Sequence, residues 1–143
     1  MTIYLLDANV FIQAKKLHYG FDFCPAFWDW LDREHKAGIV VSIEQVATEL
    51  IAGADDLAAW AQARPSMFLS PDRAMGPSLT TVASWAQGAG YEPAAVSTFL
   101  QLADYWLVAQ AHWRKSVVVT HELPSPVGQR SAKRIRSLTH ALP

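Results

Sequence analysis

The sequence predicts an α/β domain with a mainly parallel sheet flanked by helices. Two observations lead to this prediction: short apolar runs, too brief for helices, alternate with longer segments of helical periodicity, and half of the residues are apolar. A chain of 143 residues can bury one compact core of this kind. The expected strands are residues 3–6, 39–42, 67–69 and 117–120.

Helical segments are expected between these strands, and proline, glycine and aspartate mark several of their ends. Pro25 and Pro93 suit the first turn of a helix, Gly38 and Gly53 suit the end of one, and Asp55 suits an N-cap. The expected helices are residues 10–16, 25–36, 43–52, 57–63, 78–87 and 94–113. Strands joined through helices form right-handed parallel crossovers, so a parallel sheet follows.

Polar residues follow three of the expected strands at their carboxyl ends, where parallel sheets bind ligands. These residues are Asp7, Ser42 and the run Thr120-His121-Glu122. The fold prediction therefore selects them as candidate site residues.

Composition indicates a cytoplasmic protein without a membrane segment. The single cysteine, Cys24, cannot form an internal disulfide, which suits a reducing compartment. No apolar stretch reaches the roughly 18 residues of a membrane-spanning helix. The first seven residues lack the basic start and small-residue cleavage site of a signal peptide.

The charges divide the chain into an acidic domain, residues 1–128, and a basic tail, residues 129–143. The domain holds all 13 acids and eight of the 12 basic residues. The tail contributes Arg130, Lys133, Arg134 and Arg136 and no acid. This distribution fits a metal site beside a phosphate-binding strip, and it equally fits a solvated terminus.

Asp104 is the acid whose position is hardest to explain as an ordinary surface residue. On a helix of 3.6 residues per turn over residues 94–113, it lies in the middle of an apolar face formed by Leu100, Leu107, Val108 and Ala111. An unpaired carboxylate there costs several kcal/mol unless it is paired, bound to metal or protonated. A buried aspartate satisfied by the backbone or by an arginine is the alternative. By contrast, Asp29, Asp32 and Glu34 are expected to be solvated acids.

Three further acids stand where one pocket could receive them together with Asp104. Asp7 and Glu122 end strands, and Glu49 borders the apolar face of its helix. Each has a plain alternative: a helix cap for Asp7, an exposed helical residue for Glu49 and a loop acid for Glu122. Several carboxylates without a zinc-type set of Cys and His suit Mg²⁺ or Mn²⁺.

Four segments that contain these acids resemble PIN domains, including VapC-type toxins of toxin–antitoxin pairs. They are residues 4–12 (YLLDANVFI), 42–50 (SIEQVATEL), 103–111 (ADYWLVAQA) and 120–122 (THE). The aromatic run of residues 21–30 and the run of residues 120–126 are similar to an uncharacterised PIN-like subfamily. The resemblance covers about residues 3–126. At the C-terminus, where such proteins continue into a further strand and helix, the basic tail departs from the pattern, so we expect that strand to be missing or altered.

The resemblance implies a metal-dependent endoribonuclease that acts as the toxin of a type II toxin–antitoxin pair. The implied partners are RNA, an antitoxin protein and a second copy of the chain. The implied cofactor is Mg²⁺ or Mn²⁺. The implied catalytic and metal-binding residues are Asp7, Glu49, Asp104 and Glu122, and those that orient them or contact the substrate are Asn9, Ser42, Thr120 and His121.

Two other functions remain open at this stage. One is a PIN-like module that binds partners and has lost catalysis. The other is a phosphatase of the haloacid-dehalogenase type, which would need a second Asp where this chain has Asn9. The helix over residues 94–113 also carries a second apolar stripe, which predicts either a dimer or antitoxin surface, or a face covered by the chain's own Trp28 and Trp30. This stripe consists of Phe99, Leu102, Trp106 and Trp113.

Overall fold

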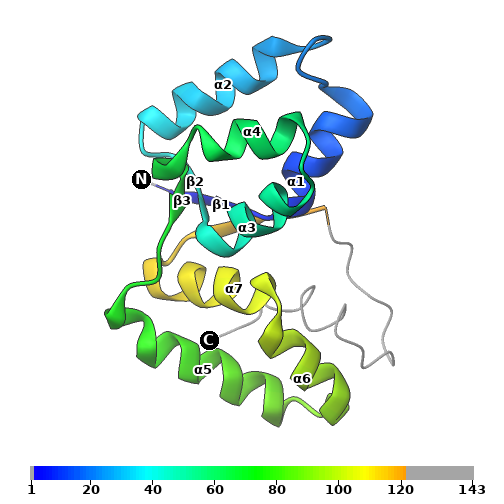
Figure 1. Cartoon of the computed structure of the whole chain (residues 1–143). Coiled ribbons are helices and arrows are strands. Elements are labelled where there is room, and N and C mark those ends of the chain that lie inside the picture. The colour runs from blue at the N-terminus through cyan, green and yellow to red at the C-terminus, as the bar shows by residue number, and fades with distance from the viewer. Residues whose placement is uncertain (1, 122–143) are drawn as a thin grey trace. The chain divides into compact units, whose positions relative to one another are not determined.

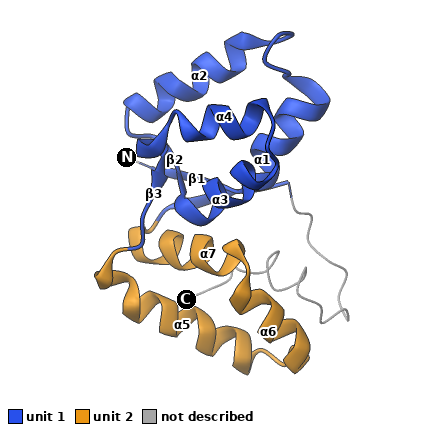
Figure 2. Cartoon of the chain, viewed as in Figure 1, with its two compact units in different colours: residues 1–71, 116–121 blue, residues 72–115, 122–143 orange. Residues whose placement is uncertain are grey.

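A computed structural model describes residues 2–121, and these form two compact units (Figure 2). Unit 1 contains residues up to Pro71 together with Ser116–His121, and it holds all four strands that the structure describes. Unit 2 contains Asp72–Lys115 and is helical throughout its regular elements. Glu122, the basic tail and the further C-terminal strand considered above lie outside the described residues.

The sheet of unit 1 is parallel, in the strand order β3-β2-β1-β4 (Figure 1). Its strands are β1 (Tyr4–Leu6), β2 (Val40–Ile43), β3 (Phe68–Leu69) and β4 (Val117–Val119). In the register, Tyr4 stands between Val40 and Val117, and Leu6 stands beside Val119. The predicted α/β class with a parallel sheet is confirmed.

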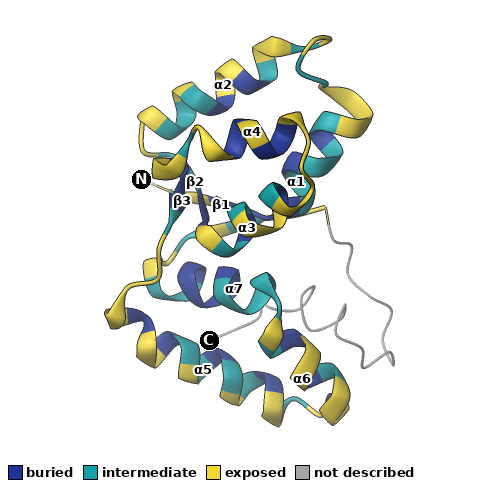
Figure 3. Cartoon of the chain, viewed as in Figure 1, coloured by how far each residue is buried: buried dark blue, intermediate teal, exposed yellow. Residues whose placement is uncertain are grey.

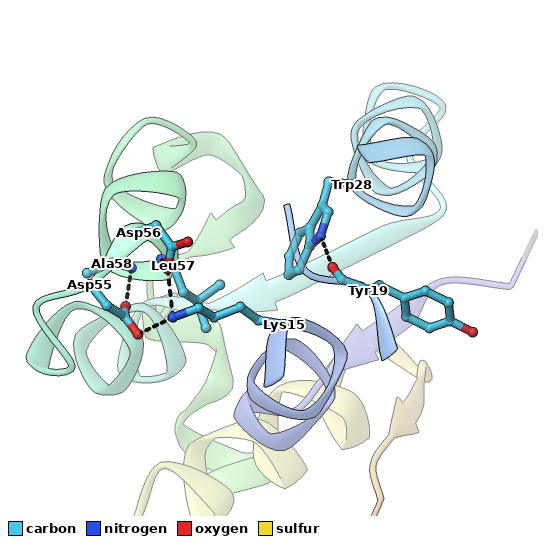
Figure 4. Close-up of polar contacts among 7 residues, drawn as sticks. All are labelled: Lys15, Tyr19, Trp28, Asp55, Asp56, Leu57 and Ala58. Carbon is cyan, nitrogen blue, oxygen red and sulfur yellow. Dashed lines mark hydrogen bonds and ion pairs between the residues drawn. The ribbon is translucent and has the colours of Figure 1, made fainter. Parts of the chain in front are cut away.

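Four helices belong to unit 1; three of them end within one residue of the predicted bounds, whereas α1 begins two residues before the predicted start at residue 10. They are α1 (Ala8–Gln13), which continues as a π-helical turn (Ala14–His18), α2 (Pro25–Lys36), α3 (Glu44–Ala52) and α4 (Asp56–Gln62). Pro25 occupies the first turn of α2. Asp55 caps α4, where its carboxylate accepts a 3.0 Å hydrogen bond from the Ala58 N–H (Figure 4).

An aromatic core holds α1, α2 and α4 against the sheet. Phe11 is fully buried, and its ring lies 5.7 Å from Trp60 and 6.0 Å from Phe68. Trp28 packs edge-on against Trp60 at 5.0 Å, and its indole N–H donates to the Tyr19 carbonyl at 2.6 Å (Figure 4). The buried stripes on α1 and α4 in Figure 3 are the helical faces that form this core.

Asp32 differs from the solvated acid that the sequence predicts. It accepts two hydrogen bonds from the Arg64 guanidinium, at 2.7 and 3.0 Å, and the guanidinium also lies 4.5 Å from the Trp60 ring centre. Arg64 follows α4, 32 residues along the chain, so no local spacing marked this pair. The Asp32–Arg64 ion pair joins α2 to the residue that follows α4 by two positions.

Unit 2 packs three helices around its own apolar cluster. The helices are α5 (Gly76–Gly88), α6 (Pro93–Gln101) and α7 (Ala103–Arg114), and a short 3₁₀ turn, Arg73–Met75, precedes them. Val82, Phe99 and Ala109 are completely buried in the cluster. The Tyr105 hydroxyl donates to the Leu79 carbonyl at 2.8 Å and so links α7 to α5.

The single helix predicted over residues 94–113 is wrong, because the chain turns at Leu102 between α6 and α7. Leu102 has extended backbone angles, φ −91° and ψ 158°, and no glycine or proline marks the break. The turn lets Phe99 on α6 and Val108 on α7 face the same core, and such tertiary packing outweighs helix propensity.

The same break divides the apolar stripe that suggested a dimer surface. Phe99 is completely buried in the core of unit 2, and Trp113 packs against that core. Neighbours within unit 2 therefore cover both residues, in place of the expected Trp28, which is buried in the core of unit 1, and Trp30, which is exposed in that unit. None of the described helices is long and apolar enough to span a membrane.

Candidate functional site

Asp7 lies at the carboxyl end of β1 and caps α1. Its backbone N–H donates to the Val119 carbonyl at 3.0 Å, which fastens the end of β1 to β4. Its side chain is buried, and Oδ1 accepts from the Ala8 N–H at 2.7 Å. The capping function considered from the sequence is therefore real. An ionised carboxylate has about four lone-pair sites, so capping leaves room for further ligands.

A directed chain of hydrogen bonds joins the ends of β1 and β4 at this carboxylate. The His121 N–H donates to Asn9 Oδ1 at 3.2 Å, and Asn9 Nδ2 donates to Thr120 Oγ1 at 3.1 Å. Thr120 Oγ1 in turn donates to Asp7 Oδ2 at 3.0 Å. Thr120 Oγ1 also lies 3.5 Å from Asn9 Oδ1, and the shorter bond to Asp7 orients the Asp7 carboxylate. We call Asp7, Asn9, Thr120 and His121 the strand-end cluster.

Ser42 supports this cluster from the neighbouring strand. It lies in β2 and is completely buried, and its hydroxyl donates to the Leu6 carbonyl at 2.7 Å. Leu6 directly precedes Asp7, so this bond ties the end of β1 to β2. Ser42 thus fixes the backbone of the residue before Asp7, and its hydroxyl proton is used in this hydrogen bond to the Leu6 carbonyl.

Glu49 is exposed on α3 and lines a small pocket of about 100 Å³ with Ile12, Lys15 and Asp55. Ile12 follows Asp7 by five residues, which corresponds to about 7.5 Å along a helix axis. The pocket of Glu49 thus opens farther along α1 than the strand-end cluster. The exposed helical position considered for Glu49 is what the structure shows.

Lys15, which lines that pocket, forms ion pairs with two acids of unit 1. Lys15 Nζ lies 2.8 Å from Asp55 Oδ2 and 2.6 Å from Asp56 Oδ1 (Figure 4). Hydrogen bonds to the two carboxylates raise the pKa of Lys15, and the bond from Lys15 lowers the pKa of Asp55. This lysine stabilises the junction of the π-helical turn with α4.

Asp104 lies in unit 2, half-buried in the first turn of α7. Leu107, Val108 and Ala111 follow it as buried residues, so its predicted apolar face is present on α7, whereas Leu100 belongs to α6. A carboxylate in the first turn of a helix is favoured by the helix dipole. Glu122, the fourth predicted acid, lies outside the described residues.

The donor atoms around Asp7 fit a hard divalent cation by their chemistry. The carboxylate of Asp7, the amide oxygen of Asn9 and the hydroxyl of Thr120 supply oxygen alone, the donor that Mg²⁺ and Mn²⁺ prefer. Within residues 2–121, no three His, Cys, Asp or Glu side chains gather closely enough to hold one metal ion.

Sequence reasoning missed Glu34, which it treated as a solvated acid. In the structure, Glu34 is half-buried and lines an apolar pocket with Phe27, Trp30 and Leu31 of the same helix. The spacing i, i+3, i+4, i+7 of these four residues was the signal that could have placed the acid on the inner face of α2.

The chain is an α/β protein with a parallel sheet, and the carboxylate of Asp7 is held in one orientation at the carboxyl end of the first strand. The sequence model of one family, described as domain of unknown function (DUF4411), matches residues 4–142. The match spans nearly the whole chain, which therefore belongs to this family. No curated protein and no solved structure matches the chain significantly.

Proposed function

We propose that the protein is a metal-dependent endoribonuclease. The observation that carries the proposal is the oriented carboxylate of Asp7, buried at the edge of a parallel sheet where such folds bind their ligands. The four PIN-like segments of the sequence provide the class of reaction, which is hydrolysis of RNA phosphodiester bonds.

The resemblance of the four sequence segments to PIN domains is what supports Asp7, Glu49, Asp104 and Glu122 as the proposed ligands of Mg²⁺ or Mn²⁺. A bound ion would supply a water of lowered pKa and would offset charge that builds on the phosphate. The Thr120 hydroxyl donates a hydrogen bond to Asp7 Oδ2 and so holds the carboxylate in one orientation. Asn9 fixes the Thr120 hydroxyl, and the backbone of His121 fixes Asn9.

The biological setting proposed is that of a cytoplasmic toxin paired with an antitoxin protein, acting as a homodimer. The PIN-like segments support the toxin, and the single Cys24 supports a reducing compartment. The basic residues of the tail add phosphate-binding charge to an otherwise acidic chain.

A partner-binding module without catalysis is the second candidate. The observation that favours it is that Glu49 is exposed and lines a pocket with Lys15 and Asp55. None of the residues of the strand-end cluster lines this pocket. In that case, the strand-end cluster would serve to hold β1 and β4 together.

An RNA cleavage assay tests the main proposal. Purified protein should cut end-labelled RNA in Mg²⁺ or Mn²⁺, lose this activity in EDTA and regain it when metal is restored. Asp29→Asn, on the exposed side of α2, is the matched control and should cut like the wild type. Cleavage that persists in EDTA, or no cleavage of any RNA with either metal, would contradict the proposal.

A further inference from the structure

Unit 1 contains an apolar pocket between α2 and the sheet that the proposed nuclease function does not use. Its volume is about 360 Å³, within the range of roughly 300–1,000 Å³ that is usual for small-molecule sites. We call it the α2 pocket. Its lining residues are Tyr4, Leu6, Val10, Phe27, Trp30, Leu31, Glu34, Ile39, Val40 and Val119.

The wall and the floor of the α2 pocket come from regular elements. Phe27, Trp30, Leu31 and Glu34 lie on one face of α2, at helical spacing. The floor is the sheet, where Leu6 of β1 stands beside Val119 of β4 in the register.

Glu34 contributes the one carboxylate among the lining residues, and it is half-buried. Within the part of the chain that the structure describes, no ion pair or side-chain hydrogen bond engages it. A neutral apolar ligand would strip water from this carboxylate without replacing its charge, which costs free energy. A cationic ligand would provide a counter-charge to this carboxylate.

Aromatic residues of both α2 and the sheet line the pocket. Trp30 and Phe27 stand on α2 with ring centres 6.1 Å apart, and Tyr4 stands on β1. Trp30 and Tyr4 remain 44% and 38% exposed, so a ligand can reach them. The faces of such rings attract cations, and the attraction grows when the cation loses water.

From the volume, the rings and the acid, we propose that the α2 pocket binds an organic ammonium ion with an apolar alkyl or aryl body. The ammonium group pairs with Glu34, and the body packs on Trp30, Phe27 and the valine and leucine floor. None of its lining residues belongs to the strand-end cluster, so the proposal does not rest on the proposed nuclease function.

Three matched probes test the proposal by calorimetry on the full chain: 2-phenylethylammonium, 2-phenylethanol and 3-phenylpropanoate. They share an aryl body and differ in charge. The ammonium ion should bind at least about tenfold more tightly than the alcohol, and the carboxylate should bind most weakly. Nuclear magnetic resonance should show the Trp30 indole N–H among the shifted signals.

Single-residue variants test which residues contact the ammonium group and which contact the aryl body of the probe. Glu34→Gln should weaken the ammonium probe about tenfold and leave the alcohol unchanged, whereas Asp29→Asn, on the same helix but outside the pocket, should change neither. Trp30→Ala, at an exposed position, should weaken both probes and serves if Glu34→Gln fails to fold. Equal binding of alcohol and ammonium, binding that Glu34→Gln does not affect, or no binding of any probe would overturn the proposal.

Discussion

At the scale of single residues, Asp7 caps α1 and is also a proposed metal ligand, and one substitution can separate these two roles. Its Oδ1 caps α1 through the Ala8 N–H, and its Oδ2 accepts from Thr120. Capping needs only a side-chain oxygen, whereas metal binding needs negative charge. Asparagine keeps the first property and removes the second.

Asp7→Asn should therefore lower RNA cleavage by about a hundredfold or more and change the melting temperature little. Asn and Asp cap helices about equally, so α1 should remain intact. Activity and thermal melts on the same preparation provide the measurement. If the variant cut RNA at the wild-type rate, Asp7 would be a structural cap only.

Asp32 predicts a pH dependence of stability. Hydrogen bonds from the Arg64 guanidinium lower its pKa below the ordinary value, which is about 3.9. A carboxyl whose pKa is lower in the folded state stabilises the fold above its unfolded pKa, and this contribution disappears as falling pH protonates it. The pair should contribute about 1 kcal/mol, a modest figure because both side chains are partly exposed.

Urea unfolding measures this contribution as the difference between wild type and Asp32→Asn. The difference should be present at neutral pH and should shrink below about pH 4, with Asp29→Asn showing no such trend. A difference that stayed constant through this range would mean that the Arg64 pair does not carry the effect.

At the scale of helices and strands, local signals predicted most of the elements. Pro25 and Asp55 marked helix starts, and short apolar runs marked each of the four strands found within residues 2–121. The break at Leu102 could not be predicted, because it depends on packing between α6 and α7 and not on any local breaker. The Asp32–Arg64 ion pair could not be predicted for a similar reason, since it joins residues 32 positions apart in the sequence.

The candidate site was predictable to the extent that it follows the backbone of the sheet. The carboxyl ends of β1 and β4 bring Asp7 and Thr120 together because parallel strands end at a common edge. Glu49 was harder to place, since the rotation and packing of α3 decide which pocket its side chain lines. Asp104 kept its apolar face, but on a shorter helix than expected.

The first turn of α7 carries a prediction about Asp104. Asp104→Asn should abolish cleavage because it removes a proposed metal ligand, and it should change the melting temperature little because asparagine has nearly the shape of aspartate. Thermal melts with and without metal provide the measurement. A melting temperature lower by several degrees would instead identify Asp104 as a structural ion-pair partner.

At the scale of the whole molecule, the acids proposed as metal ligands are distributed along the chain. Asp7 and Glu49 belong to unit 1, and Asp104 belongs to unit 2. The family match extends from residue 4 to residue 142, so it covers the sequences of both units and not that of the sheet alone.

Self-association provides the prediction at this scale. Trp106 is half-buried on α7, with its ring 5.9 Å from Tyr105, whereas Phe99 of the same predicted stripe is completely buried. If the remaining apolar surface pairs two copies, the wild type should be a dimer and Trp106→Glu a folded monomer in light scattering. An unfolded variant would show that Trp106 belongs to the core.

The most direct test of the account is a calorimetric titration of the metal-free protein with Mn²⁺, for the wild type and for Asp7→Asn. If Asp7 is a metal ligand, the wild type should bind Mn²⁺, and the variant should bind it at least about tenfold more weakly while it keeps the wild-type circular dichroism spectrum. Asp29→Asn should bind like the wild type. Mn²⁺ binding that is equally strong in Asp7→Asn, or absent from the folded wild type, would contradict the claim that this acid serves a metal-dependent nuclease.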